Sequence, residues 1–129
     1  MKGGKGMNKE LKVFKMNDCE WWVTDGNAEE INNWYNQNIE DNDISDVNLC
    51  DIDREGMWYL TTDIKDIERL GDSDEIIGFE IVEGQHKRKV RFGDLTRKYD
   101  EIYKFISFRD ALVKEPPYTK PYCIASTEW

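Results

Sequence analysis

Residues 11–23 read LKVFKMNDCEWWV, two apolar segments separated by the turn-forming pair Asn17-Asp18. Both segments, residues 11–16 and residues 21–23, are rich in β-branched and aromatic side chains, which favour extended strands. Asn and Asp are common in turns because their side chains hydrogen-bond the neighbouring backbone. The stretch therefore predicts an antiparallel β-hairpin near the start of the folded region.

A last strand is predicted near the other end of the sequence, over residues 122–127, where Pro121 opens it. Its small and apolar centre favours burial on both faces. Hydrogen-bonding residues lie near the ends of both predicted strand regions, so we expect them to meet in one sheet with a shared polar edge. The edge residues either satisfy one another's hydrogen bonds or form a ligand or partner site. They are Asn17, Asp18, Ser126 and Glu128.

The same two regions carry motifs, Asn-Asp-x-acid-Trp at residues 17–21 and Ala-Ser-Thr-Glu-aromatic at residues 125–129. In these motifs the chain resembles a family of short uncharacterised phage and prophage proteins. The likeness extends to a first helix, an acidic middle and a Phe-x-x-x-Leu helix before the final strand. The chain departs from the family in using Glu20 for the acid and in a longer basic hairpin near residue 88. The resemblance implies a phage or mobile-element setting and brings no activity with it.

The best-signalled helix begins after Asn27. Glu30 follows three residues later, which is the spacing of a capping box, where each side chain satisfies a backbone N–H of the other residue. Apolar residues then recur at helical spacing on one face, which we expect to belong to the core. This face consists of Ile31, Trp34, Tyr35 and Ile39.

Two more helices are predicted further along the chain. Thr62 caps a helix that carries Ile64, Ile67 and Leu70 and ends at Gly71. Another helix begins at Ser107 and runs through Leu112 and Val113 until Pro116 stops it, because proline has no backbone N–H to continue the helix.

A second hairpin is predicted from residues 76–83 and 87–92, around a two-residue turn at Gly84-Gln85. Its expected register places Phe79 opposite Val90 and Ile77 opposite Phe92, so that apolar side chains face one another. With a short strand at residues 57–60, these elements predict an α+β fold. We expect a single domain over residues 11–129, a mostly antiparallel sheet with two or three helices packed on it, after a flexible leader at residues 1–10.

The net charge of −9 is unevenly distributed along the 129 residues. Residues 17–84 hold 20 Asp or Glu against three Arg or Lys, whereas residues 1–16 and 85–129 each carry a net charge of +4. A concentrated negative field repels nucleic acid and attracts cationic surfaces, which makes direct nucleic-acid binding through this region unfavourable.

We therefore expect the acidic middle to bind a basic host or phage protein. The residues predicted to do so are Asp41, Asp43, Asp46, Asp51, Asp53 and Glu55. In the sharpest version, their carboxylates stand where phosphates would, and the protein inhibits a host nuclease or defence complex by nucleic-acid mimicry. The alternative interpretation is that the same charges only solvate the surface and keep the protein soluble.

Two other functions stay open on the sequence alone. One is a small-molecule or metal-binding domain, a vestigial enzyme, that uses the polar edge near Asp18 and Glu128. The other is nucleic-acid contact by the basic segment at residues 87–91 together with the lysine-rich start.

No catalytic, cofactor or metal motif emerges from the sequence. Cys19, Cys50 and Cys123 are too widely separated for a Cys-x-x-Cys site, and His86 is the only histidine. The run Asp51-Ile52-Asp53-Arg54-Glu55-Gly56 opens like a calcium loop, but Thr62 stands where that loop needs a bidentate Glu, so we predict a tight acidic turn. Unpaired cysteines and the lack of a long apolar run predict a cytoplasmic protein without membrane spans.

Overall fold

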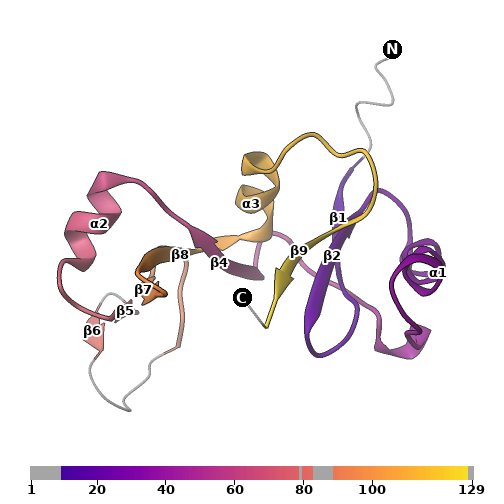
Figure 1. Ribbon diagram of the computed structural model, residues 1–129, viewed down its shortest axis with the longest axis horizontal. Coiled ribbons are helices and arrows are strands. Elements are labelled where there is room, and N and C mark those ends of the chain that lie inside the picture. Colours follow the sequence, from indigo (N-terminus) through magenta and orange to yellow (C-terminus); the bar gives the residue numbers. More distant parts are fainter. Residues whose placement is uncertain (1–9, 79, 83–88, 128–129) are drawn as a thin grey trace. The chain divides into compact units, whose positions relative to one another are not determined.

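The computed structural model describes residues 10–78, 80–82 and 89–127 (Figure 1). These residues form three α-helices, one short 3-10 helix and nine strands in two antiparallel sheets, so the predicted α+β class is confirmed. The chain folds as two compact units. The terminal unit consists of the residues up to Ile52 and from Glu115 onward, and the central unit of Asp53–Lys114.

The sheet of the terminal unit has the strand order β3-β1-β2-β9. Its strands are β1 (Lys12–Lys15), β2 (Glu20–Thr24), β3 (Asn48–Leu49) and β9 (Tyr122–Ser126). The predicted first hairpin is confirmed, with Val13 opposite Val23. The predicted meeting of the first and last strand regions is also confirmed, because β9 pairs antiparallel with β2 (Figure 1).

Strand β9 lies at an edge of this sheet, next to β2 alone. Ile124 is buried whereas the preceding Cys123 is exposed. Successive side chains of a strand point to opposite faces, so one face of β9 is covered and the other is open. The expectation of burial on both faces is wrong, because the short apolar run is packed from one side only.

Helix α1 (Ala28–Asn38) supplies the other half of the terminal core. Its capping box is present: the Asn27 side chain accepts from the Glu30 backbone N–H at 2.9 Å, and the Glu30 carboxylate accepts from the Asn27 N–H at 3.0 Å. Ile31 and Tyr35 are buried against Phe14, Met16 and Trp22. Ile39 is 46% exposed, because the helix ends before it.

Replacing the cap residue should destabilise the terminal unit. We expect Asn27→Ala to lower the free energy of unfolding by about 1 kcal/mol, because the Glu30 N–H loses its acceptor. Urea unfolding monitored by tryptophan fluorescence measures the change. Asn33→Ala, at an exposed position of α1, is the matched control, and an equal loss in both variants would contradict the assigned cap.

The sheet of the central unit has the strand order β4-β8-β7-β5-β6. Its strands are β4 (Gly56–Leu60), β5 (Glu75–Ile77), β6 (Glu80–Val82), β7 (Leu95–Lys98) and β8 (Glu101–Ser107). The predicted strand at residues 57–60 is confirmed as β4. It follows a turn at residues 52–54, as expected of a tight acidic turn.

The predicted hairpin of residues 76–83 and 87–92 is wrong in the part that the structure describes. Ile77 pairs with Glu80 and not with Phe92, because the chain already reverses after Ile77. Gly78 has φ of 61°, a backbone conformation that glycine adopts without steric cost. The second neighbour of β5 is β7, where Ile76 lies opposite Leu95. Phe79 and residues 83–88, including the expected Gly84-Gln85 turn, lie outside the described residues.

The hairpin between β7 and β8 was not predicted. Its turn residues, Tyr99 and Asp100, have φ of 53° and 64°, values that favour glycine or asparagine. A tyrosine at such a position gives no turn signal in the sequence. The stretch therefore resists assignment until the strands on either side of it are seen to pair.

Two short helices complete the central unit, α2 (Ile64–Leu70) and α3 (Phe108–Lys114). The cap of α2 is Asp63 rather than the predicted Thr62, and Gly71 ends the helix as expected. Leu70 packs with Ile76, Leu95 and Ile102, whereas Ile64 and Ile67 of the expected apolar stripe are exposed. The start of α3 is confirmed, because the Ser107 hydroxyl accepts from the Asp110 N–H at 3.1 Å.

Candidate functional site

The terminal unit contains a long stretch without positive charge. Residues 17–52 hold ten Asp or Glu and no Lys, Arg or His, and they form β2, α1 and the chain that follows α1. Most of the carboxylates are on exposed residues: Asp18, Glu29, Glu30, Glu40, Asp41, Asp43, Asp46 and Asp51. Four of the six residues predicted to bind a partner belong to this group.

Residues 40–46, hereafter the acidic loop, are held against α1 by asparagine side chains. The Asn42 carbonyl accepts from the amides of Asn32 and Asn36, each at 3.2 Å. The Asn42 N–H donates to the Asn36 side chain, and the Asn42 amide donates to the Met16 carbonyl at 2.9 Å. Asn42 thus joins α1 to the end of the first strand, and its neighbours Asp41 and Asp43 are held in place on either side of it.

The second half of the acidic loop is a single turn of 3-10 helix, η2 (Ile44–Asp46). Asp43 caps it, because its carboxylate accepts from the Ser45 backbone N–H at 2.9 Å. This hydrogen bond holds the pKa of Asp43 below its usual range. Asp43 is therefore ionised throughout the neutral range, and its charge is fixed at the surface.

The charges of the acidic loop oppose the field of the helix they follow. The C-terminal end of a helix carries a partial negative charge, which Lys or Arg normally offsets, yet α1 has no basic residue in its last turn. Among the described residues, no Lys or Arg forms an ion pair with Asp41, Asp43 or Asp46. Within the part of the chain that the structure describes, these three negative charges therefore have no ion-pair partner.

Two of the six predicted residues, Asp53 and Glu55, fall in the central unit. Asp53 binds the guanidinium of Arg109 through both carboxylate oxygens, with 3.0 Å between its Oδ2 and the second nitrogen. This hydrogen-bonded pair holds the pKa of Asp53 below its usual range and ties the turn at residues 52–54 to α3. The acidic surface that we consider further therefore consists of the acidic loop in the terminal unit.

Removing the amide of Asn42 should loosen the acidic loop. We expect Asn42→Ala to lower the free energy of unfolding by about 1–3 kcal/mol, because the Met16 carbonyl and the Asn32 side chain lose a partner. Urea unfolding provides the measurement, with Gln37→Ala on the exposed side of α1 as the control. Equal stability of the two variants would show that Asn42 does not anchor the loop.

The predicted polar edge serves mainly to close the first hairpin. The side-chain oxygen of Asn17 accepts from the N–H groups of Cys19 and Glu20, and its side-chain amide donates to the Tyr35 hydroxyl at 3.4 Å. The Thr127 N–H donates to the Cys19 carbonyl at 2.9 Å, which extends the pairing of β2 with β9 beyond Ser126. Asp18 is exposed, and Glu128 lies outside the described residues.

Beneath this edge lies the half-buried carboxylate of Glu20, which the sequence identified only as the acid of the first end motif. Glu20 accepts from the Tyr35 hydroxyl at 2.9 Å and from the Trp22 indole N–H at 3.0 Å. Burial, and then the hydrogen bond to Glu20, raise the pKa of Tyr35 well above its ordinary value. The phenol is therefore a fixed donor that joins α1 to the first hairpin.

Because the pKa of Tyr35 is raised in the folded state, the free energy of unfolding should change with pH in the alkaline range. The stability that neutral Tyr35 contributes is present in full below about pH 10, the pKa of an unfolded tyrosine, and is lost as pH rises above it. We expect the free energy of unfolding to stay level up to about pH 9 and to fall as the pH rises above about 10. The fall should be smaller in Tyr35→Phe than in the control Tyr99→Phe, and equal falls would contradict the assignment.

The cysteines of the described residues differ in exposure. Cys50 is buried, Cys19 is exposed, and burial around the Cys123 thiol raises its pKa although the residue as a whole is exposed. No group of three or more His, Cys, Asp or Glu in this part of the chain is placed to hold a metal ion. No helix among the described residues combines the length and apolarity needed to cross a membrane. His86 and the basic residues 87 and 88 lie outside them.

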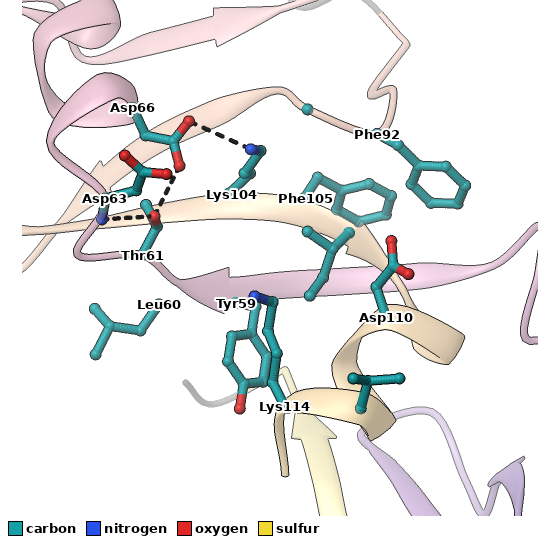
Figure 2. A pocket seen from close by; sticks show the side chains of 13 residues that line it. Tyr59, Leu60, Thr61, Asp63, Asp66, Phe92, Lys104, Phe105, Asp110 and Lys114 are labelled. Carbon is teal, nitrogen blue, oxygen red and sulfur yellow. Dashed lines mark hydrogen bonds and ion pairs between the residues drawn. The ribbon is translucent and has the colours of Figure 1, made fainter.

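The central unit contains a cleft that was not predicted from the sequence. It has a volume of about 570 Å³ and lies between β4, β8, α3 and the start of α2 (Figure 2). Tyr59 and Lys104, which face each other across β4 and β8, form part of its wall. These residues are far apart in the sequence, and only the register of two strands that were not predicted to pair brings them together.

Comparisons with known proteins give no further guide. No family model, curated protein or solved structure matches the chain.

Proposed function

We propose that this protein is a non-enzymatic accessory protein of phage or prophage origin that binds a basic protein surface through the acidic loop. The observation that carries the proposal is the anchoring of Asn42, which presents Asp41, Asp43 and Asp46 at the surface without an ion pair to any described base. A basic partner would supply the missing countercharge.

The fixed position of the acidic loop favours binding over mere solvation. A loop that is already ordered loses little conformational entropy when it binds, so more of the interaction energy appears as affinity. Exposed apolar side chains accompany the charges, since Ile39 and Ile44 are each 46% exposed. Apolar contacts bordered by charges are typical of protein interfaces.

The finer version of the proposal is inhibition of a host nuclease or defence complex in the bacterial cytoplasm. In this version the carboxylates of the acidic loop occupy a groove that normally holds a phosphate backbone. The setting rests on the resemblance of the two end motifs to phage and prophage proteins. The charge pattern supports the mode of binding, since a negative surface accelerates association with a basic groove.

A charge-matched pair of variants tests the proposal. Asp41→Asn, Asp43→Asn and Asp46→Asn together remove three charges from the acidic loop, and Asp72→Asn, Asp74→Asn and Asp100→Asn remove three from exposed positions of the central unit. Each protein is immobilised and used to retain proteins from a bacterial host lysate. We expect the first variant to lose basic proteins that the natural sequence and the second variant retain, because only the first lacks the binding charges.

Salt provides an independent check on the same assay. Retention through exposed charges should weaken as the ionic strength rises, because screening shortens the range of the interaction. The proposal fails if both triple variants retain the same proteins as the natural sequence. It also fails if the retained proteins are acidic.

A further inference from the structure

The cleft of the central unit has the size and lining of a small-molecule site. Its volume of about 570 Å³ falls within the range of about 300–1,000 Å³ that such sites occupy. Its lining combines apolar side chains with a few charged ones, and all the lining residues belong to the central unit. It is thus a different place from the acidic loop.

Two of the three carboxylates of the cleft, those of Asp63 and Asp66, are already engaged in holding the fold. Asp66 is buried, and it accepts from the Thr61 hydroxyl at 2.8 Å and pairs with the Lys104 ammonium at 3.3 Å (Figure 2). Asp63 accepts from the Lys65 N–H at 2.9 Å as the cap of α2. Asp110 lies in the first turn of α3, where the helix field stabilises a negative charge.

The two lysine ammonium groups of the cleft, in contrast, have N–H donors that are not used within the described residues. An ammonium has three N–H donors, and Lys104 uses one of them on Asp66. Lys114 is exposed, and among the described residues it has no hydrogen-bond or ion-pair partner. Figure 2 shows the two lysines coming from different walls of the cleft, Lys104 from β8 and Lys114 from α3. Lys104 and Lys114 therefore leave unused N–H donors at the cleft.

Apolar and aromatic surface surrounds these cations. Phe92 stacks on Phe105 with 5.7 Å between ring centroids, and Phe92 is itself 42% exposed. Leu60 and Val113 are 45% and 81% exposed, although both are large apolar side chains. Exposed apolar surface gathered around a concave site is a mark of ligand binding.

We propose that this cleft binds a small organic anion with an apolar, aromatic body. Its carboxylate or phosphate group would accept hydrogen bonds from Lys104 and Lys114, and its apolar body would cover the exposed side chains at the cleft. Asp66 acts here as a positioning residue that holds the Lys104 ammonium in place. The inference is independent of the proposed function, since it concerns the other unit.

A panel of simple probes tests the charge and the body of the ligand separately. The full chain is titrated with 2-naphthoate, its neutral amide 2-naphthamide, acetate, phenyl phosphate and inorganic phosphate, and binding is followed by the NMR shifts of backbone amides. We expect an aryl anion to shift residues of the cleft, such as Thr61 and Lys114, while 2-naphthamide, acetate and inorganic phosphate bind far more weakly. The tighter of 2-naphthoate and phenyl phosphate identifies the preferred anionic group.

Two variants tie the binding to the lysines. Lys114→Gln should weaken binding of the aryl anion about tenfold, because a hydrogen bond to a charged group is lost. Lys65→Gln, an exposed lysine of α2 that does not line the cleft, should leave binding unchanged. Because Lys104→Gln alone would strand the buried Asp66, the double change Lys104→Gln with Asp66→Asn removes the cation while keeping a neutral hydrogen-bonding pair, and it should also weaken binding.

Three results would overturn the inference. They are no binding of either aryl anion at millimolar concentration, equal binding of 2-naphthamide and 2-naphthoate, or equal weakening by Lys114→Gln and Lys65→Gln. The acidic-loop variant with Asp41, Asp43 and Asp46 changed to Asn should bind the aryl anion as the natural sequence does. Failure of the cleft inference is thereby distinguished from failure of the proposed function.

Discussion

The acidic loop depends on hydrogen bonds between uncharged groups, and Asn42 makes most of them. Carboxylates that crowd the negative end of a helix repel one another and the helix field, so charge alone would drive this segment away from α1. The amides of Asn32 and Asn36 hold the Asn42 carbonyl, while the Asn42 amide reaches the Met16 carbonyl. Neutral anchors therefore hold the acidic loop in place, although no described base forms an ion pair with Asp41, Asp43 or Asp46.

Each unit has charged groups that are not fully used within the described residues. They are carboxylates in the terminal unit and lysine ammonium groups in the central unit. In the terminal unit Asp41, Asp43 and Asp46 have no ion pair with a described base, whereas in the central unit the cleft has spare ammonium donors and two carboxylates that are already engaged. Other charges are paired within the fold, as Asp53 is with Arg109. The proposed partner and the proposed ligand would each bind to charges that these internal pairs leave unused.

Local signals in the sequence were sufficient for the elements that depend on near neighbours. The first hairpin, α1 with its Asn27–Glu30 box, and the start of α3 at Ser107 follow from residues three or four positions apart. Other features depend on long-range contacts or on unusual backbone conformations. The early reversal at Gly78 and the turn at Tyr99 carry no distinctive pattern, and nothing local in the sequence links Asn42 to the asparagines of α1 that hold it. The cleft depends on the register between β4 and β8, which no local sequence pattern predicts.

The proposed mode of binding requires the acidic loop to be a fixed surface and not a mobile charged segment. Backbone order parameters from NMR relaxation test it most directly, for residues 40–46 compared with those of α1. We predict values for the loop close to those of the helix, at about 0.85, which is typical of rigid backbone. Values below about 0.6 across these residues would mean that the carboxylates have no defined arrangement, and the proposed mode of binding would lose its structural basis.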